Sequence, residues 1–220
     1  MKSVVFDLDG TLADTSADLI AAANACFLGM GERAVLDPVA DAGIAFRGGR
    51  AMLRAGLERL GRPDDAVVEA WYPRLLAAYE AEIDRHTVLY PGAMAAVEAL
   101  RGSGHAVAIC TNKPERLARI LLDRLGVARA FGALVGADTL PVRKPDPRPF
   151  REAVARAGGA PGRAMLVGDT VTDRDTARAA GAPVALVTFG PNGAGAAALE
   201  PDALLAEYGE LEGIAGRLLR

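Results

Sequence analysis

Five short apolar segments recur along the chain and alternate with segments of helical periodicity. They span residues 3–8, 105–110, 132–136, 163–168 and 182–190. Each segment is too short for most helices, and each is almost continuously apolar, as in parallel strands that are covered on both faces. The pattern predicts an α/β fold: a Rossmann-like, doubly wound parallel sheet.

Three of the intervening segments carry helix signals. Residues 91–104 open with a proline and close with a glycine, residues 113–126 have leucines at helical spacing before a glycine, and residues 171–181 also end in a glycine. Proline in the first turn and glycine after the last turn are typical helix boundaries. The alternation of strand and helix is therefore expected to continue through the second half of the chain.

The alternation is interrupted once, after the first predicted strand. Residues 15–86 contain no convincing strand pattern and read as three helices, the third of which should kink or restart at Pro73. We therefore predict a helical cap domain over 15–86, inserted into a Rossmann-like catalytic core made of 1–14 and 87–220. The insert leaves the carboxyl end of a strand, where open α/β sheets bind ligands, so its position suits a lid.

Composition narrows the classes of partner. The 220 residues carry a net charge of -3, and the basic residues are dispersed rather than clustered, so a nucleic-acid partner is not expected. No membrane segment and no signal peptide are expected, which predicts a cytoplasmic protein. A monomer or a homodimer is expected. Cys26 and Cys110 lie outside any metal-binding pattern, so buried free thiols are expected.

Polar side chains follow the predicted strands at the points where these strands end. They are Asp7, Asp9, Thr111, Asn112 and Asp169, with Lys144 in the loop before a later helix. Taken singly, each has an ordinary explanation, such as a solvated turn, a helix cap or a surface lysine. The carboxyl ends of parallel strands meet at one edge of a sheet, and carboxylates gathered there need a cation or protons to offset their repulsion.

The residue types favour a phosphate site with a metal. Asp7, Asp9 and Asp169 offer hard oxygen ligands without His or Cys, which fits Mg²⁺ better than zinc. Lys144, the hydroxyl of Thr111 and nearby backbone N–H groups are suited to hold phosphate oxygens. The expected partner is therefore a small phosphorylated substrate.

Four stretches together resemble the haloacid dehalogenase superfamily of phosphohydrolases. They are DLDGT (7–11), CTNKP (110–114), RKPDP (143–147) and GDTVTD (168–173). They occur in the order typical of that family, and the resemblance covers almost the whole chain. The helical insert resembles the C1-type cap of that family. The resemblance implies a hydrolase, and Asp9 and the DGT sequence favour a phosphatase over a mutase or a dehalogenase.

The resemblance also implies a role for each matching residue. Asp7 would be the nucleophile that forms an aspartyl-phosphate, and Asp9 would protonate the leaving oxygen and later activate water. The Mg²⁺ ligands would be the Asp7 carboxylate, the Asp9 backbone carbonyl and Asp169, with Asp173 orienting a metal-bound water or Lys144. Thr111 and the Asn112 backbone would bind phosphate, and Lys144 would offset charge on the nucleophile and the phosphate.

The substrate is expected to be selected by the helical insert. Further stretches, among them LYPGAMAAVEALRGSG (89–104) and TFGPNG (188–193), resemble bacterial phosphoglycolate phosphatases, which implies 2-phosphoglycolate as the first candidate. Sugar phosphates, N-acetylmuramic acid 6-phosphate and pyrophosphate remain alternatives, as does a non-catalytic phosphate-binding module. Arg47 and Arg50 flank a glycine pair before a helix and are candidates for binding the substrate carboxylate, or are solvated arginines.

Overall fold

The computed structural model describes residues 1–160 and 162–220, which form two compact units. Met1–Ala13 and Leu89–Arg220 make up the first, called here the sheet unit, and Asp14–Val88 make up the second, called the helical unit. Within the described ranges, no helix has both the length and the apolar character needed to cross a membrane.

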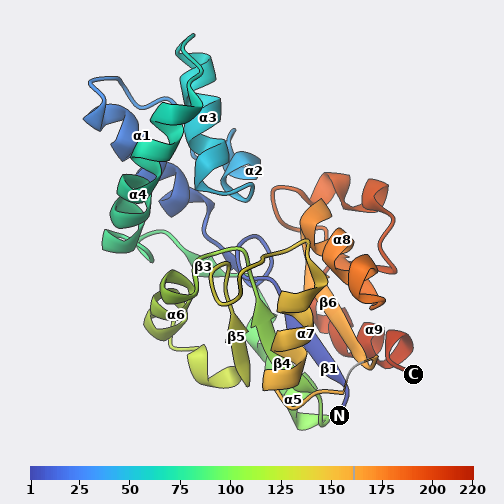
Figure 1. Cartoon of the computed structure of the whole chain (residues 1–220). Helices are drawn as coiled ribbons and strands as arrows, with labels where there is room; N and C mark the ends of the chain where they lie inside the picture. The colour runs from blue at the N-terminus through green and yellow to red at the C-terminus, as the bar shows by residue number, and fades with distance from the viewer. Residues whose placement is uncertain (161) are drawn as a thin grey trace. The chain divides into compact units, whose positions relative to one another are not determined.

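The sheet unit is built on a single six-stranded sheet in which every pairing is parallel (Figure 1). The strand order is β5-β4-β1-β6-β7-β8, so the chain starts in the middle, builds one side and then returns to build the other. The strands are β1 (Ser3–Phe6), β4 (Ala106–Cys110), β5 (Ala133–Val135), β6 (Ala164–Gly168), β7 (Val184–Val187) and β8 (Ala203–Leu205). The predicted doubly wound parallel sheet is therefore confirmed, with β8 added at one edge.

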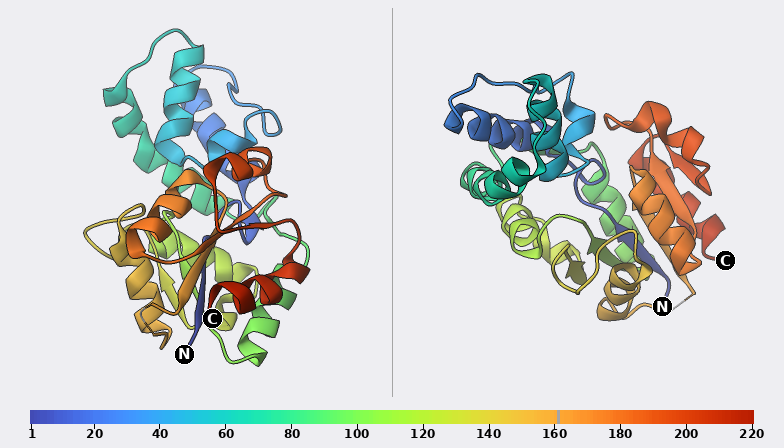
Figure 2. Two further views of the ribbon diagram at one scale, coloured as in Figure 1. Left: turned by 90° about the vertical axis from the view of Figure 1, so that its right-hand side faces the viewer. Right: turned by 45° about the horizontal axis from the view of Figure 1, so that its top comes forward.

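Helices cover both faces of this sheet. They are α5 (Ala93–Gly102), α6 (Glu115–Arg124), α7 (Pro147–Arg156), α8 (Val171–Ala180) and α9 (Leu211–Leu218), with 3₁₀ turns η1 (Ala128–Ala130), η2 (Gly193–Leu199) and η3 (Tyr208–Glu210). Figure 2 shows α7 and α8 on one face and α5 and α9 on the other. Helices on both faces explain why the strands are apolar almost without interruption.

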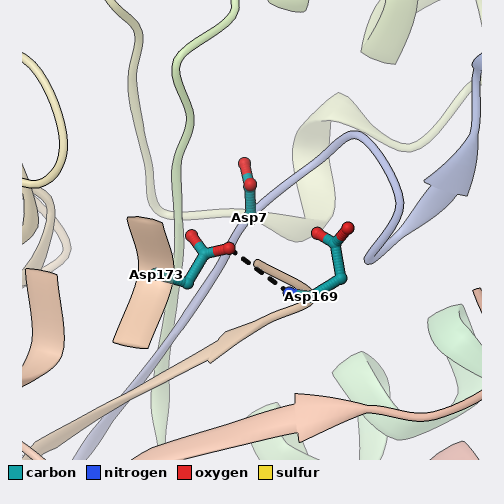
Figure 3. Close-up of side chains that lie close together, drawn as sticks. All are labelled: Asp7, Asp169 and Asp173. Carbon is teal, nitrogen blue, oxygen red and sulfur yellow. Dashed lines mark hydrogen bonds between the residues drawn. The ribbon is translucent and has the colours of Figure 1, made fainter. Parts of the chain in front are cut away.

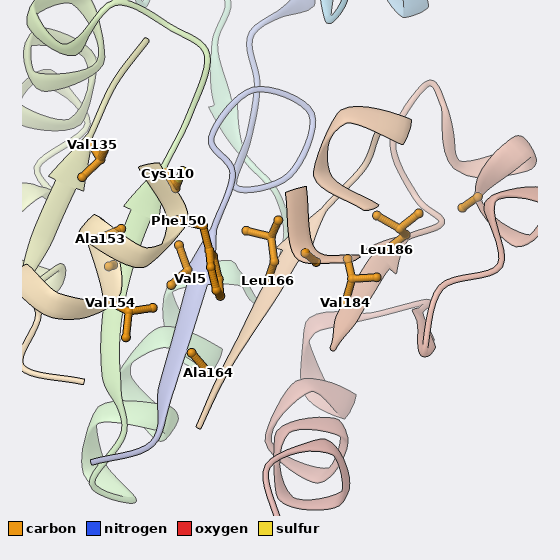
Figure 4. Close-up of a cluster of buried hydrophobic side chains, with 13 residues drawn as sticks. Val5, Cys110, Val135, Phe150, Ala153, Val154, Ala164, Leu166, Val184 and Leu186 are labelled. Atoms are coloured by element: carbon orange, nitrogen blue, oxygen red, sulfur yellow. The ribbon is translucent and has the colours of Figure 1, made fainter. Parts of the chain in front are cut away.

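The core beneath α7 and α8 contains alternate residues of the central strands (Figure 4). Val5 of β1 and Leu166 of β6 point to this face, and Phe150 of α7 packs against them. Phe6 and Val167 are also buried but belong to the opposite face, because successive strand residues alternate. Both free cysteines are buried, as predicted, and Cys110 is part of this core.

The helical unit contains α1 (Ser16–Gly29), α2 (Ala42–Ala45), α3 (Gly49–Arg59) and α4 (Asp65–Ala81). Helices α1, α3 and α4 pack against one another. Gly56 permits a close approach of α1 and α3, because a Cβ atom there would lie 2.0 Å from the ring of Phe27. Two short strands, β2 (Ala13–Asp14) and β3 (Val88–Leu89), pair where the chain enters and leaves this unit.

The predicted restart of the helix at Pro73 is wrong. Helix α4 runs from Asp65 to Ala81 as one element with Pro73 inside it. Val68, Leu75 and Tyr79 are buried along one side of this helix. Proline removes only one hydrogen-bond donor, and burial of residues before and after it stabilises the continuous helix.

Candidate active site

Three carboxylates converge at the carboxyl ends of the two central strands (Figure 3). Asp7 follows β1, Asp169 follows β6, and Asp173 lies in the first turn of α8. One oxygen from each carboxylate lies within 4.8 Å of the others. Asp169 and Asp173 are buried and Asp7 is nearly so, which makes this an unusual concentration of acidic groups in a low-dielectric place.

The sheet topology explains why these residues meet. β1 pairs with β4 on one side and with β6 on the other, and Phe6 is level with both Ile109 and Val167. The strand order reverses beside β1, which is where open α/β sheets bind ligands. The Asp7 N–H still donates to the Val167 carbonyl at 2.9 Å, so the sheet fixes the backbone of Asp7.

Asp9 lies in a turn that begins soon after β1 ends. Gly10 has φ of 79°, a left-handed conformation that glycine adopts without strain. The Gly10 N–H donates to the Ala13 carbonyl at 2.9 Å, and the Leu12 N–H donates to Leu8 at 3.0 Å. The chain therefore curls immediately after β1, and the side chains of Asp7 and Asp9 contact different partners.

Lys144 lies buried among the acidic groups. Its Nζ is 2.6 Å from Asp173 Oδ1 and 3.0 Å from Asp7 Oδ2. Its backbone carbonyl accepts a hydrogen bond from the Asn112 side chain at 3.0 Å, which ties the β5–α7 loop to the loop after β4. The predicted convergence of the motif residues is thus visible in the positions of Asp7, Lys144, Asp169 and Asp173.

Burial and charge shift the proton equilibria of these groups. Burial, with the carboxylates of Asp173 and Asp9, raises the pKa of Asp7 to about 6 in spite of the opposing charge of Lys144. Burial and the charges of Asp173 and Asp7 raise the pKa of Asp169 as well. For Lys144, burial lowers the pKa, but attraction to Asp173 and Asp7 outweighs it, so the pKa rises and the ammonium stays charged.

Asp169 is held by hydrogen bonds to both of its oxygens. Thr11 Oγ1 donates to Oδ1 at 3.0 Å, and Asn192 Nδ2 donates to Oδ2 at 3.2 Å. The Tyr208 hydroxyl donates to the Thr11 carbonyl at 2.6 Å and so supports the loop that carries Thr11. Sequence reasoning did not assign a role to Asn192 or Tyr208, and no local pattern marks them as neighbours of Asp169.

Asp173 is fixed at the start of α8. Its Oδ2 accepts hydrogen bonds from the Thr170 hydroxyl at 2.7 Å and from the Thr170 N–H at 3.1 Å, while Oδ1 receives Lys144. Gly168 makes room for this carboxylate, because a Cβ atom at Gly168 would lie 2.4 Å from Asp173 Cγ. The close approach of Asp173 thus explains why a residue without a side chain occupies the first position of the GDT sequence.

The loop after β4 contributes a second buried lysine, which the sequence analysis did not select. Lys113 Nζ lies 2.6 Å from Asp9 Oδ1. The Lys113 N–H donates to Thr111 Oγ1 at 3.2 Å, and the Thr111 N–H donates to the Val135 carbonyl at 2.9 Å. The sequence signal that could have found Lys113 is its place inside the TNKP stretch.

The two arginines selected from the sequence lie in the helical unit. Arg50 makes a two-pronged ion pair with Glu69, at 2.6 and 2.8 Å, and its guanidinium stacks 3.7 Å above the centre of the Tyr72 ring. Arg47 is exposed, and among the described residues its guanidinium makes no hydrogen bond or ion pair. The guanidinium of Arg50 is therefore already engaged within its own unit, whereas that of Arg47 is not.

The oxygen donors at Asp7, Asp169 and Asp173 fit a divalent metal ion. The donors are hard oxygens, without the sulfur or imidazole groups that zinc prefers. Burial first, and then the neighbouring carboxylates, raise the pKa values of Asp7 and Asp169, so a further positive charge would stabilise their charged forms. A divalent cation bound by these oxygens would supply that charge.

Comparison with known proteins agrees with this geometry. Residues 1–181 match the family model of haloacid dehalogenase-like hydrolases. Among curated relatives, a phosphoglycolate phosphatase of Mesorhizobium japonicum is 38% identical over 99% of this chain and 96% of its own length. The phosphoglycolate phosphatase of Rhodospirillum rubrum is 40% identical over 86% of this chain and 80% of its own.

Solved structures show the same fold. A crystal structure described as a predicted phosphoglycolate phosphatase from Haemophilus somnus 129pt has a TM-score of 0.85 at 24% identity, covering 97% of each chain. A predicted phosphatase from Clostridium acetobutylicum has a TM-score of 0.82 at 20% identity, covering 99% of each chain. The resemblance stated from the four motifs is confirmed: the chain belongs to the haloacid dehalogenase-like hydrolases.

Proposed function

We propose that this hydrolase is a Mg²⁺-dependent phosphatase of small phosphorylated metabolites, with 2-phosphoglycolate as the first substrate. The observation that supports this proposal most directly is the buried contact between Lys144 Nζ and Asp7 Oδ2, which are 3.0 Å apart. This contact lies beside Asp169 and Asp173, at the point where the strand order of the sheet reverses. The name phosphoglycolate phosphatase, borne by relatives that are 38% and 40% identical, supports this choice of substrate.

The proposed reaction has two steps at one carboxylate. An oxygen of Asp7 attacks phosphorus, the bond to the leaving oxygen breaks, and Asp9 gives that oxygen a proton. Water then attacks the phosphorus of the aspartyl-phosphate while Asp9 takes its proton, the bond between phosphorus and the Asp7 oxygen breaks, and inorganic phosphate leaves with the Asp7 carboxylate regenerated. The Leu8 N–H donates to Asp7 Oδ1 at 2.7 Å, which helps to direct the other oxygen toward the substrate.

The surrounding groups stabilise charge during both steps. Lys144 holds Asp7 and offsets the negative charge that accumulates beside it, and Asp173 fixes Lys144. The Thr111 hydroxyl and the backbone N–H of Asn112 are proposed to bind phosphate oxygens. Mg²⁺, held by Asp7, Asp169 and the Asp9 carbonyl and supported by Asp173, would add positive charge at the phosphoryl group.

We propose that the helical unit is the cap of this enzyme and that it selects the substrate. Of the two candidate arginines, Arg47 is the better choice for a substrate carboxylate, because Arg50 is occupied by Glu69 and Tyr72. Replacing Arg47 with Ala should raise KM for 2-phosphoglycolate more than for a neutral aryl phosphate. An equal effect on both esters would remove Arg47 from carboxylate recognition.

The proposal is tested with a panel of phosphorylated metabolites assayed with Mg²⁺, with EDTA and with Asp7→Asn. We expect hydrolysis of 2-phosphoglycolate that requires Mg²⁺ and that Asp7→Asn abolishes. A chain that hydrolyses no phosphate ester, or an Asp7→Asn variant with full turnover, would contradict the mechanism. A large preference in kcat/KM for sugar phosphates would change only the substrate.

A further inference from the structure

Lysine is rare in this chain. Of 25 basic residues only three are lysines, namely Lys2, Lys113 and Lys144. The surface ion pairs of the described residues use arginine, as in Arg101 with Glu98 and Arg156 with Glu152. Two of the three lysines are instead buried in the candidate active site. A compact ammonium on a flexible stem has therefore been used where two carboxylates must be neutralised at close range.

The two buried lysines contact different carboxylates of the DLDGT motif. Lys144 contacts Asp7 and Asp173, whereas Lys113 contacts Asp9. The side chain of Lys113 is 3% exposed and that of Asp9 is 17% exposed, so the ammonium is buried and the carboxylate is more accessible to solvent. The first pairing offsets charge on the proposed nucleophile, and the second holds Oδ1 of Asp9.

The backbone of Lys113 is itself well fixed. Its N–H donates to Thr111 Oγ1 at 3.2 Å, and its carbonyl accepts from the Ala137 N–H at 2.9 Å, just beyond β5. These contacts anchor the loop between the ends of two strands, so the ammonium approaches Asp9 from a rigid support. Asp9 lies beyond the end of β1 and is paired with Ala13 through an isolated β-bridge, so its backbone is not part of the six-stranded sheet.

We propose that Lys113 is a positioning residue that holds the Asp9 carboxylate where it can exchange a proton with the leaving oxygen. This inference rests on the proposed function. An acid or base must lie within about 2.6–3.2 Å of the oxygen it serves, and a displacement of about 1 Å can cost about 100-fold in rate. A buried ion pair is weak evidence for a purely stabilising role, because apolar residues often replace such pairs without loss of stability.

Two substrates with different leaving groups can distinguish a role of Lys113 in positioning Asp9 from a general structural role of Lys113. Proton transfer matters for 2-phosphoglycolate, whose alkoxide is a poor leaving group, and matters little for 4-nitrophenyl phosphate, whose phenolate leaves unaided. kcat/KM reports the steps up to departure of the leaving group, so hydrolysis of the common aspartyl-phosphate does not mask the difference. We expect Lys113→Met to lower kcat/KM for 2-phosphoglycolate by about 10- to 100-fold and for 4-nitrophenyl phosphate by less than about 3-fold.

Three matched variants complete the kinetic test. Asp9→Asn should show the same dependence on the leaving group. Adding Lys113→Met to Asp9→Asn should change kcat/KM by less than about 3-fold relative to Asp9→Asn alone, because both substitutions act through the Asp9 side chain. Lys2→Met is the control for loss of a lysine and should behave as the wild type. Lys113→Gln replaces Lys113→Met if the latter does not fold.

The contact itself can be observed without an assay. Lysine labelled with ¹³C at Cε should give three NMR signals, and Lys113→Met identifies the one from Lys113. Asp9→Asn should shift that signal and leave the signal of Lys2 in place. An unmoved Lys113 signal, equal losses for both esters in Lys113→Met, or no loss for either would overturn the inference. A wild-type chain that hydrolyses neither ester overturns the proposed function as well, whereas equal losses overturn only the role of Lys113.

Discussion

Lys144 Nζ lies 3.0 Å from Asp7 Oδ2 although 137 residues separate the two in the chain. The ammonium is buried, and a second carboxylate, Asp173, holds it from the other side at 2.6 Å. The role of nucleophile proposed for Asp7 requires a fixed position and a neighbouring positive charge that water cannot screen. One lysine provides both.

Replacing Lys144 with Met should destabilise the protein as well as inactivate it. The change leaves Asp7 and Asp173 buried without their shared cation, which typically costs about 3–5 kcal/mol in the free energy of unfolding. Urea unfolding in EDTA measures this loss, with Lys2→Met as the control. The loss should be smaller at pH 5 than at pH 7.5, because Asp7, with a pKa of about 6, is then mostly protonated. An equal loss at both pH values would contradict the electrostatic explanation.

The metal-free protein should become less stable as the pH rises. The pKa of Asp7 is raised from its ordinary 3.8 to about 6, so the folded chain holds a proton that the unfolded chain has already released. The resulting stability is fully present below pH 3.8 and is lost as the pH rises through about 6. Urea unfolding in EDTA between pH 4.5 and 7.5 should show this decrease, and Asp7→Asn should reduce it. A wild-type curve that matches that of Asp7→Asn would show that Asp7 does not titrate in this way.

Added Mg²⁺ should reverse that pH dependence. Ligand carboxylates bind a cation in their deprotonated form, so the affinity for Mg²⁺ should increase between pH 5 and 7.5, with release of protons. Calorimetry in two buffers of different ionisation enthalpy counts the protons released. Asp169→Asn should weaken binding and release fewer protons, because it removes both a ligand and a group of raised pKa. Proton release that Asp169→Asn leaves unchanged would place the cation elsewhere.

Gly168→Ala should displace Asp173. The added Cβ would lie 2.4 Å from both Asp173 Cβ and Cγ, so the carboxylate must move away from Lys144. Overpacking of this kind costs about 1–3 kcal/mol, and a loss of kcat should accompany it. Gly216→Ala is the control, since nothing lies within 4 Å of a Cβ there and the residue is inside α9. That variant should be as stable as the wild type or more stable by about 0.5–1 kcal/mol. Gly168→Ala with wild-type stability and kcat would contradict the steric argument.

Phe150→Ala should test the core that supports the site. Phe150 is 3% exposed and packs from α7 against β1 and β6. Removing so large a buried side chain typically costs about 3–5 kcal/mol. Since Phe150 belongs to the apolar core, the folded variant should retain its KM when assayed well below its melting temperature. A large change in KM would mean that α7 positions the substrate site more directly than this packing indicates.

The periodicity of the sequence determined the fold class, because short continuous apolar runs between helical segments are compatible with few architectures other than a parallel sheet covered on both faces. It also placed Asp7, Thr111 and Asp169 at strand ends and Lys144 in the loop before a helix, and the four motifs placed the chain in its family. These are local properties, since strand ends, turns and helix boundaries depend on neighbouring residues. Helix α4 is the exception, where packing preserved a helix that Pro73 alone would have interrupted.

Only the tertiary structure decided which side chains contact one another. Lys113 and Asp9 are 104 residues apart, and Tyr208 and Thr11 are 197 apart, so no local pattern relates them. Asn192 contacts Asp169 only because β7 lies beside β6 in the sheet. The sequence thus determined where the carboxylates would lie, whereas long-range packing decided which cation or donor each would receive, because partners distant in the chain meet only when the whole sheet is formed.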